Sequence, residues 1–260
     1  MRTRWSAAVV LPVLLALAGC VPALVPTPTS EDHRTISALR TDPDGRGLVA
    51  ACSGGGCDGR ARLVVHETPS RVDLDLVVEE STDGACPAIA TSGSVAADFA
   101  QPLGRRTLWS GGRRLVPFDG RRLPASSQLP AGFVLSGEQG GSEPRPDGAV
   151  DVTDTWTARY ADPAPSTVGD TCRPSRGELA VTFGPASAAP SFDGWTRMGV
   201  VDLRPARAVL RRQGDVGSVD QWSYAWLTQG KSVEVRSSGL CAGDVILGPT
   251  ELLPVVRSLG

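Results

Sequence analysis

The feature that most constrains the fold of this chain is the alternation of apolar and polar residues along several short segments. In Arg71–Glu80, the apolar Val72, Leu74, Leu76 and Val78 are separated by charged residues. A period of two places apolar side chains on one face of a β-strand and polar side chains on the other. Because such segments recur between turns rich in glycine and proline, we predict a β-rich fold.

The first predicted folded region is a β-rich domain over residues 36–139. Arg60–Glu67 and Arg71–Glu80 have the pattern of a hairpin, and residues 68–70 supply its turn. Ser94–Ala100 alternates again and is a further strand candidate. The sequence therefore predicts short antiparallel strands throughout this region.

A segment without apolar residues separates this region from the next. Gly140–Gly148 reads GGSEPRPDG, and we interpret residues 140–149 as a linker. Residues 150–260 are predicted to form a second antiparallel-sheet domain. Its strand candidates are Val150–Tyr160, Glu178–Phe183, Arg197–Leu203, Ala206–Arg212, Val219–Thr228 and Ser232–Ser237.

Aromatic residues mark one of these predicted strands. Trp222, Tyr224 and Trp226 fall on the same face, and Gln229-Gly230 forms a predicted tight turn into the next strand. We interpret the three aromatic side chains as core that packs under a helix. An open groove for a sugar or an acyl chain is the alternative interpretation.

The last segment, Gly248–Leu259, is predicted to be helical. Its apolar face consists of Leu252, Leu253, Val256 and Leu259. Thr250 is a candidate N-cap, and Pro254 predicts a short or kinked helix because proline lacks the N–H group and crowds the preceding turn. The predicted fold class is therefore β-rich α+β, with two antiparallel-sheet domains and a short C-terminal helix packed on the second sheet.

The amino-terminal segment, residues 1–19, has the build of a secretory signal peptide. Arg2 and Arg4 precede an apolar run over residues 7–18. A run of about a dozen residues is too short to span the hydrocarbon core of a membrane, which is roughly 30 Å thick. The run ends at Leu17-Ala18-Gly19-Cys20, a tetrapeptide that resembles the bacterial lipobox.

The lipobox resemblance implies a lipoprotein signal peptide and a lipid attachment site at Cys20. The thiol would receive diacylglycerol with palmitate-type chains, and the mature protein would be anchored to the extracytoplasmic face of the cell membrane. Each buried CH₂ contributes about 0.8 kcal/mol, so two or three acyl chains hold a protein durably. Residues 20–35 are then predicted to be the acylated cysteine and a proline-rich stalk.

Composition argues against several classes of protein. The formal net charge is −2 and Lys231 is the single lysine, which disfavours nucleic-acid binding. Neither C-x-x-C nor G-x-S-x-G occurs, and the glycine-rich Ser53–Gly56 is not followed by the Lys-Ser/Thr pair of a phosphate-binding loop. His33 lies in the predicted stalk, and His66 lies in a predicted strand beside Glu67, where we interpret it as a surface residue. We predict no metal, no cofactor and no enzymatic activity.

Several segments resemble uncharacterised actinobacterial exported proteins. They are Cys57–Ser81, the following Cys86, Asp98–Trp109 with its Pro-Leu-Gly-Arg turn, Trp222–Gly239 and Thr250–Leu259. The abundance of alanine, glycine, proline and arginine is typical of a GC-rich genome. The group has no defined activity, so the resemblance implies an exported protein and nothing about its chemistry.

Cysteines of an exported chain are expected to form disulfides. The family resemblance implies a Cys57–Cys86 bridge, and Cys172 with Cys241 would then connect two parts of the second domain. Each bridge contributes about 2–4 kcal/mol of stability. Cys52 is left over and is interpreted as an unpaired thiol; a Cys52–Cys57 or a Cys52–Cys86 bridge is the alternative.

Taken together, these features predict a membrane-anchored extracytoplasmic lipoprotein that binds or scaffolds something in the cell envelope, such as an envelope protein. One alternative is an envelope hydrolase that uses carboxylates from distant strands. Another is a carrier or sensor of a hydrophobic ligand, in which the aromatic residues of the second domain line a groove.

Overall fold

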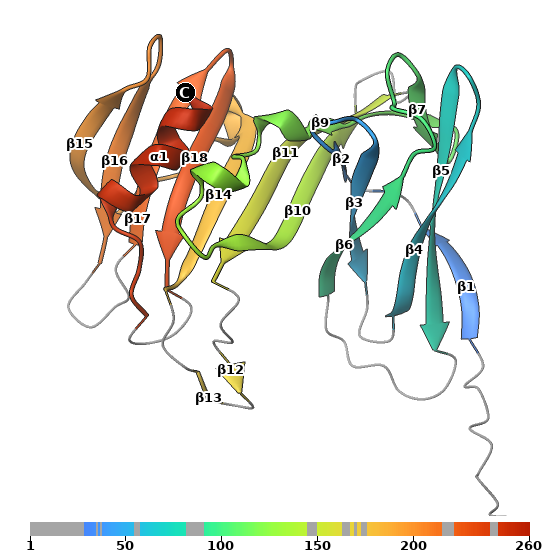
Figure 1. Cartoon of the computed structure of the whole chain (residues 1–260), viewed down its shortest axis with the longest axis horizontal. Helices are drawn as coiled ribbons and strands as arrows, with labels where there is room; N and C mark the ends of the chain where they lie inside the picture. The colour runs from blue at the N-terminus through green and yellow to red at the C-terminus, as the bar shows by residue number, and fades with distance from the viewer. Residues whose placement is uncertain are drawn as a thin grey trace, which may run out of the picture.

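The computed structural model describes residues 29–34, 36, 38–54, 58–81, 91–144, 150–162, 167–168, 171–172, 176–214, 221–239 and 244–260. This part of the chain is rich in β-strands and ends in one short helix, which confirms the predicted β-rich character (Figure 1). No helix in it has the length and apolar character needed to cross a membrane.

Strands account for most of the described elements. They are β1 (Thr29–Arg34), β2 (Ala38–Thr41), β3 (Gly47–Gly54), β4 (Asp58–Glu67), β5 (Arg71–Ser81), β6 (Thr91–Asp98), β7 (Thr107–Ser110), β8 (Arg113–Val116), β9 (Phe118–Asp119), β10 (Val134–Pro144), β11 (Val150–Ala161), β12 (Thr167–Val168), β13 (Thr171–Cys172), β14 (Glu178–Pro185), β15 (Thr196–Asp202), β16 (Arg207–Gln213), β17 (Gln221–Thr228) and β18 (Lys231–Ser238). The helical elements are η1 (Gly120–Arg122), η2 (Ser126–Gln128), η3 (Ala186–Ala188) and α1 (Pro249–Leu259).

Two sheets carry the fold. The larger runs in the order β1-β5-β7-β8-β11-β14-β18-β17-β16-β15, with β4 added to β5 and β10 added to β11. The smaller has the order β6-β3-β2-β9, and β12 and β13 form a separate two-stranded ladder. The predicted β4–β5 hairpin and the six strands predicted between residues 150 and 237 are confirmed, with shifts of one or two residues at their ends.

The larger sheet joins the two predicted halves of the chain. Strands β8 and β11 pair in parallel, with Val150 opposite Arg114. The predicted linker needs correction, because residues 140–144 belong to β10, where Gly140 pairs with Trp156. Glycine is required there, since an added Cβ would lie 2.6 Å from both the Trp156 ring and the Cβ of Ala38. Residues 145–149 lie outside the described part of the chain.

The predicted stalk also needs correction at its carboxyl end. Thr29–Arg34 form β1, which pairs antiparallel with the carboxyl half of β5. Two side chains of β1 contact other strands of the sheet. Glu31 accepts a hydrogen bond from Arg62 of β4 at 2.7 Å, and His33 lies 2.6 Å from Asp75 of β5. Residues 20–28 are outside the described residues, so the stalk there stays a prediction.

The smaller sheet lies between two layers of the core. Leu39, Leu48 and Ala50 pack against one apolar cluster with β5, whereas Ala38, Val49 and Ala51 pack against a second cluster that contains Trp156. A strand buried on both faces has a continuous apolar run in place of alternation. For this reason β3 was not predicted as a strand from the sequence, and the short β2 was not predicted because the charged Arg40 interrupts its apolar residues.

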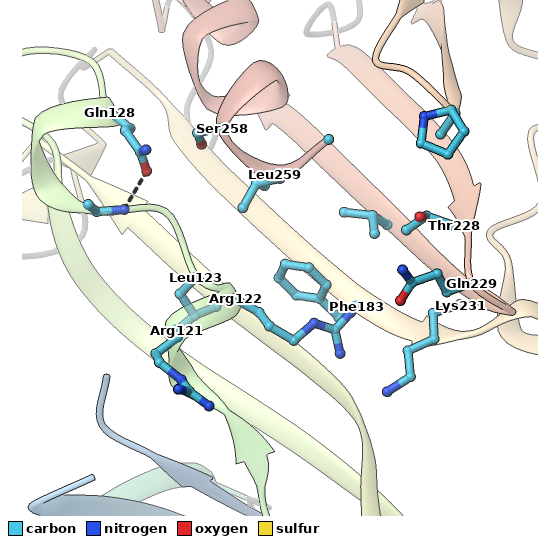
Figure 2. A pocket seen from close by; sticks show the side chains of 15 residues that line it. Arg121, Arg122, Leu123, Gln128, Phe183, Thr228, Gln229, Lys231, Ser258 and Leu259 are labelled. Atoms are coloured by element: carbon cyan, nitrogen blue, oxygen red, sulfur yellow. Dashed lines mark hydrogen bonds between the residues drawn. The ribbon is translucent and has the colours of Figure 1, made fainter. Parts of the chain in front are cut away.

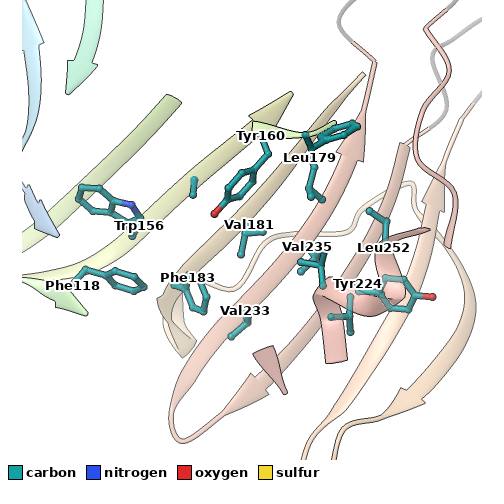
Figure 3. Packing of buried hydrophobic residues seen from close by; sticks show 14 of the residues in the cluster. Phe118, Trp156, Tyr160, Leu179, Val181, Phe183, Tyr224, Val233, Val235 and Leu252 are labelled. Atoms are coloured by element: carbon teal, nitrogen blue, oxygen red, sulfur yellow. The ribbon is translucent and has the colours of Figure 1, made fainter. Parts of the chain in front are cut away.

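The second cluster packs on the larger sheet, where α1 covers one part of it and the smaller sheet covers another (Figure 3). Tyr224 and Trp226 are buried there, which places these two members of the aromatic stripe in the core, and Trp222 is half-buried at its margin. The buried residues of α1 are Leu252, Val255 and Val256. The predicted apolar face of the helix therefore includes Leu252 and Val256 correctly, and Val255 is buried in place of Leu253.

The start of the terminal helix differs from the prediction. Gly248 is the N-cap, in place of Thr250, and its N–H donates to Glu251 Oε2 at 3.0 Å. Pro249 occupies the first helical position, where a missing N–H has no cost. Pro254 is exposed inside the helix, and the helix continues through it to Leu259.

Candidate functional site

The candidate site is a pocket of about 630 Å³ beside η1, which we call the η1 pocket (Figure 2). It is bounded by the η1–η2 segment, the β17–β18 turn and the carboxyl end of α1. The residues that line it are Arg121, Arg122, Leu123, Ala125, Gln128, Phe183, Pro205, Ala206, Thr228, Gln229, Lys231, Val233, Ser258, Leu259 and Gly260.

Arg122 is the central polar side chain of this pocket. It is half-buried, and its guanidinium carbon lies 5.0 Å from the Phe118 ring centroid and 4.7 Å from that of Phe183. Both distances are within the range of a cation–π contact. Desolvation lowers the pKa of Arg122, although the group stays charged at neutral pH. Within the described residues, no carboxylate side chain lies at salt-bridge distance from it.

The neighbouring Arg121 has a different environment because η1 is a tight turn. Asp119 is the N-cap of η1 and accepts from the backbone N–H of Arg121 at 3.1 Å. The Arg121 guanidinium turns back to the same carboxylate, with contacts of 3.0 Å and 2.9 Å. These hydrogen bonds hold the pKa of Asp119 below its ordinary value. Arg121 is therefore neutralised locally, whereas Arg122 points into the pocket.

The β17–β18 turn supplies the opposite side of the pocket. Gln229 and Gly230 both have positive φ angles, 49° and 74°, which is the geometry of the predicted tight turn. The turn places Gln229 and the exposed Lys231 across the pocket from Arg122 (Figure 2). The site thus combines cationic groups from segments separated by about a hundred residues in sequence.

The remaining surface of the η1 pocket is mixed, with the apolar Leu123, Ala206 and Leu259 beside the polar Gln128, Thr228 and Ser258. Phe183 and Val233 lie buried behind this surface. No aspartate or glutamate side chain is among the lining residues. The arrangement offers positive charge beside a surface of mixed polar and apolar side chains.

A second cavity of about 470 Å³ lies on the other side of the η1–η2 segment. Arg121, Leu123 and Ala125 line both cavities, so this segment is the partition between them. The second cavity is mainly apolar and contains Tyr160, whose pKa is raised by burial and by the charge of Glu138. The Tyr160 hydroxyl is consequently protonated throughout the physiological range.

The buried carboxylates of the described chain are paired with arginines. Glu138 is bound by Arg40, Asp151 by Arg113, and Glu234 by Arg236. Glu234 also accepts from the hydroxyl of Ser223 at 2.9 Å. None of these carboxylates lines the η1 pocket or the second cavity.

Both histidines lie on the strands of the first half. His66 is exposed on β4, consistent with its interpretation as a surface residue. His33 belongs to β1 and not to a stalk, and its Nδ1 lies 2.6 Å from Asp75 Oδ2 on an open part of the sheet. Neither His33 nor Asp75 lines the η1 pocket or the second cavity.

Most residues predicted as sites lie outside the described part of the chain. This applies to the lipid attachment site Cys20 and to the disulfide candidates Cys57, Cys86 and Cys241. The backbone places Cys172 in β13 and Cys52 in β3 opposite Gly93. The lipid anchor and both disulfides therefore stay predictions. The described residues contain no cluster of three or more histidine, cysteine, aspartate or glutamate side chains that could hold a metal.

The η1 pocket was not predicted from the sequence. Its local signals are weak: two adjacent arginines after Asp119-Gly120, and the single lysine of the chain directly after a tight turn. Only the folded chain brings these arginines and Lys231 to the same pocket. Comparisons with protein-family models, with curated proteins and with solved structures gave no match to the chain.

Proposed function

We propose that this protein is a lipoprotein anchored through Cys20 to the extracytoplasmic face of the cell membrane, and that its folded body is a non-enzymatic binding protein. The anchoring is supported by Arg2 and Arg4, the apolar run that follows, and the lipobox-like ending at Cys20. The resemblance to actinobacterial exported proteins agrees with this location.

The observation that carries the binding function is the η1 pocket. Its volume of about 630 Å³ lies within the roughly 300–1,000 Å³ typical of small-ligand sites. Its lining combines cationic and uncharged polar side chains with apolar ones such as Leu123 and Leu259, and a few polar groups that fix the orientation of a ligand are usual in such sites. A cavity of this kind favours binding over a purely scaffolding role.

The alternatives have less support. A hydrolase with paired carboxylates would need acidic groups that converge on a cavity, and the three buried carboxylates are instead held by arginines. A hydrophobic-ligand carrier built on the aromatic stripe would need an open groove, and Tyr224 and Trp226 are packed against the core. An envelope protein as partner is compatible with the proposal and would be an additional role.

Fractionation of cells that produce the full chain tests the anchoring. We expect the wild-type protein in the membrane fraction and Cys20→Ser in the soluble extracytoplasmic or culture fraction, because the acyl chains supply the membrane affinity. Cys52→Ser serves as the matched control and is expected to stay with the membrane. Equal membrane association of Cys20→Ser and wild type would refute the anchor.

A further inference from the structure

We propose that the η1 pocket binds an amphipathic organic anion, with its acidic group against Arg122 and its apolar part against Leu123, Ala206 and Leu259. This inference rests on the binding function proposed above and names the class of ligand. Carboxylate, sulfonate and phosphate groups share the chemistry that the pocket recognises.

The hydrogen-bonding state of Arg122 points to an acidic ligand. A guanidinium has five N–H donors in its plane, and aromatic rings contact its face. Phe118 and Phe183 therefore hold the group in place without using these donors. Among the described residues, no acceptor lies at hydrogen-bond distance from its side chain. A bound carboxylate or phosphate would satisfy these donors in a bidentate arrangement.

The charge around the pocket also favours an anion. The chain as a whole is acidic, with a formal net charge of −2. The pocket has the opposite sign, because Arg122 and Lys231 face it and no acidic side chain lines it. Charges in a partly enclosed cavity are screened less than those on an open surface. The electrostatic attraction of an anion is therefore stronger in this pocket than at the exposed arginine pairs elsewhere on the protein.

The size of the pocket and its accessible apolar side chains Leu123, Ala206 and Leu259 select among anions. Phe183 lies directly above Arg122 in Figure 2, and Leu259 closes the side formed by α1. A small inorganic anion would leave most of the volume of about 630 Å³ without contacts. An anion with an attached aliphatic or aromatic body would fill it and bury apolar surface. The pocket therefore fits an amphipathic molecule better than a free inorganic ion.

Two sources could provide such a ligand, a soluble metabolite or an anionic membrane lipid. The pocket lies beside the carboxyl end of α1, near the end of the chain marked C in Figure 1. Strand β1, the first described element after the proposed anchor, begins at the opposite end of the molecule. A tether that enters through β1 would leave the pocket facing away from the membrane, which favours a soluble source.

A pair of fluorescent probes tests the ligand class. 8-Anilinonaphthalene-1-sulfonate and N-phenyl-1-naphthylamine have the same aromatic skeleton, and only the first carries an anionic group. Both are titrated into the full chain with Cys20→Ser, into the same chain with Arg122→Gln, and into the same chain with Arg62→Gln. Arg62 is an exposed strand residue paired with Glu31, so its replacement removes the same charge far from the pocket.

We expect Arg122→Gln to weaken binding of the sulfonate probe at least tenfold and to change binding of the neutral probe less than twofold. Arg62→Gln should change neither. The proposal is overturned if Arg122→Gln and Arg62→Gln have the same effect, or if Arg122→Gln weakens both probes equally. The near-ultraviolet circular dichroism spectrum reports whether Arg122→Gln retains the fold. If it does not, Lys231→Gln at an exposed position takes its place, with an expected loss of severalfold for the sulfonate probe alone.

Competition distinguishes the two sources. Displacement of the sulfonate probe by octyl phosphate, without Arg122-dependent binding to phosphatidylglycerol vesicles, would assign a soluble ligand. Co-sedimentation with phosphatidylglycerol vesicles that is lost in Arg122→Gln would assign a lipid headgroup. If neither occurs, the inference is refuted. These measurements do not depend on acylation of Cys20, so their failure leaves the anchoring intact, and failure of the anchoring leaves them interpretable.

Discussion

Buried arginines connect residues that are far apart in the sequence. Arg40 on β2 donates from Nε to Glu138 Oε1 at 2.6 Å and from Nη2 to Oε2 at 2.8 Å. Trp156 Nε1 donates to the same carboxylate at 3.0 Å. The side chains of Arg40 and Glu138 are 7 % and 4 % exposed, so the buried charge of each is compensated by the opposite charge of the other. This cluster fixes the smaller sheet against β10 and β11.

The cluster leads to a prediction at the residue scale. Arg40→Met leaves Glu138 buried without its guanidinium, and we expect a loss of about 3–5 kcal/mol in the free energy of unfolding. Arg62→Met breaks an exposed pair and should cost less than about 1 kcal/mol. Urea denaturation of the two variants measures both values. A loss below about 1 kcal/mol for Arg40→Met would contradict the structural role of the pair.

A second residue-scale prediction concerns the Pro-Leu-Gly-Arg turn. Arg106 donates to Glu67, and the backbone N–H of Ala100 donates to the same carboxylate at 2.7 Å, which holds the pKa of Glu67 below its ordinary value of 4.5. A lowered folded-state pKa stabilises the protein above the unfolded-state value, and this stabilisation is lost as the pH falls through the folded-state value.

We therefore expect Glu67→Gln to lower the melting temperature at pH 7. The difference from wild type should shrink as the pH falls below about 4.5, because Glu67 of the unfolded chain is then protonated, and it should be lost once the pH has passed the lower folded-state pKa. Thermal unfolding between about pH 7 and about pH 3 measures this. A difference that stays constant over the whole range would show that the charge of Glu67 is not what stabilises the turn.

At the scale of elements, the sequence predicted those strands in which one face is buried and the other is exposed. β5, β11 and β14 belong to this class, and their alternation was sufficient. β17 and β18 instead each bury four consecutive residues. β3 was missed because both of its faces are buried, and β1 because its apolar content is low and only pairing with β5 makes it a strand. β10 was missed, in part because Gly140 and Gly141 resemble a linker in sequence, whereas in the fold Gly140 accommodates the Trp156 ring.

The terminal helix gives a prediction at this scale. Leu252 on α1 is fully buried, whereas Leu253 is half-buried. Leu252→Ala should lower the free energy of unfolding by about 2–5 kcal/mol, because it removes buried methyl groups and leaves a cavity. Leu253→Ala has the same change in helix propensity and should cost clearly less. Equal losses in urea denaturation would mean that α1 does not pack through the Leu252 face.

For the whole molecule, the larger sheet is continuous from β1 to β15, and the η1 pocket forms where η1, the β17–β18 turn and α1 approach one another. Sequence patterns report on local periodicity and could not predict this meeting of three distant segments. They did predict an anchor, because a signal peptide and lipobox are local features. We thus propose a molecule with a tether at one end and a ligand pocket at the other.

The intact mass of the protein extracted from the membranes of its host tests the central claim most directly. We predict a chain that begins at Cys20 and carries the added mass of a diacylglyceryl group, with or without a further amide-linked acyl chain. A chain that retains residues 1–19, or one that begins elsewhere and carries no fatty acid, would contradict this claim.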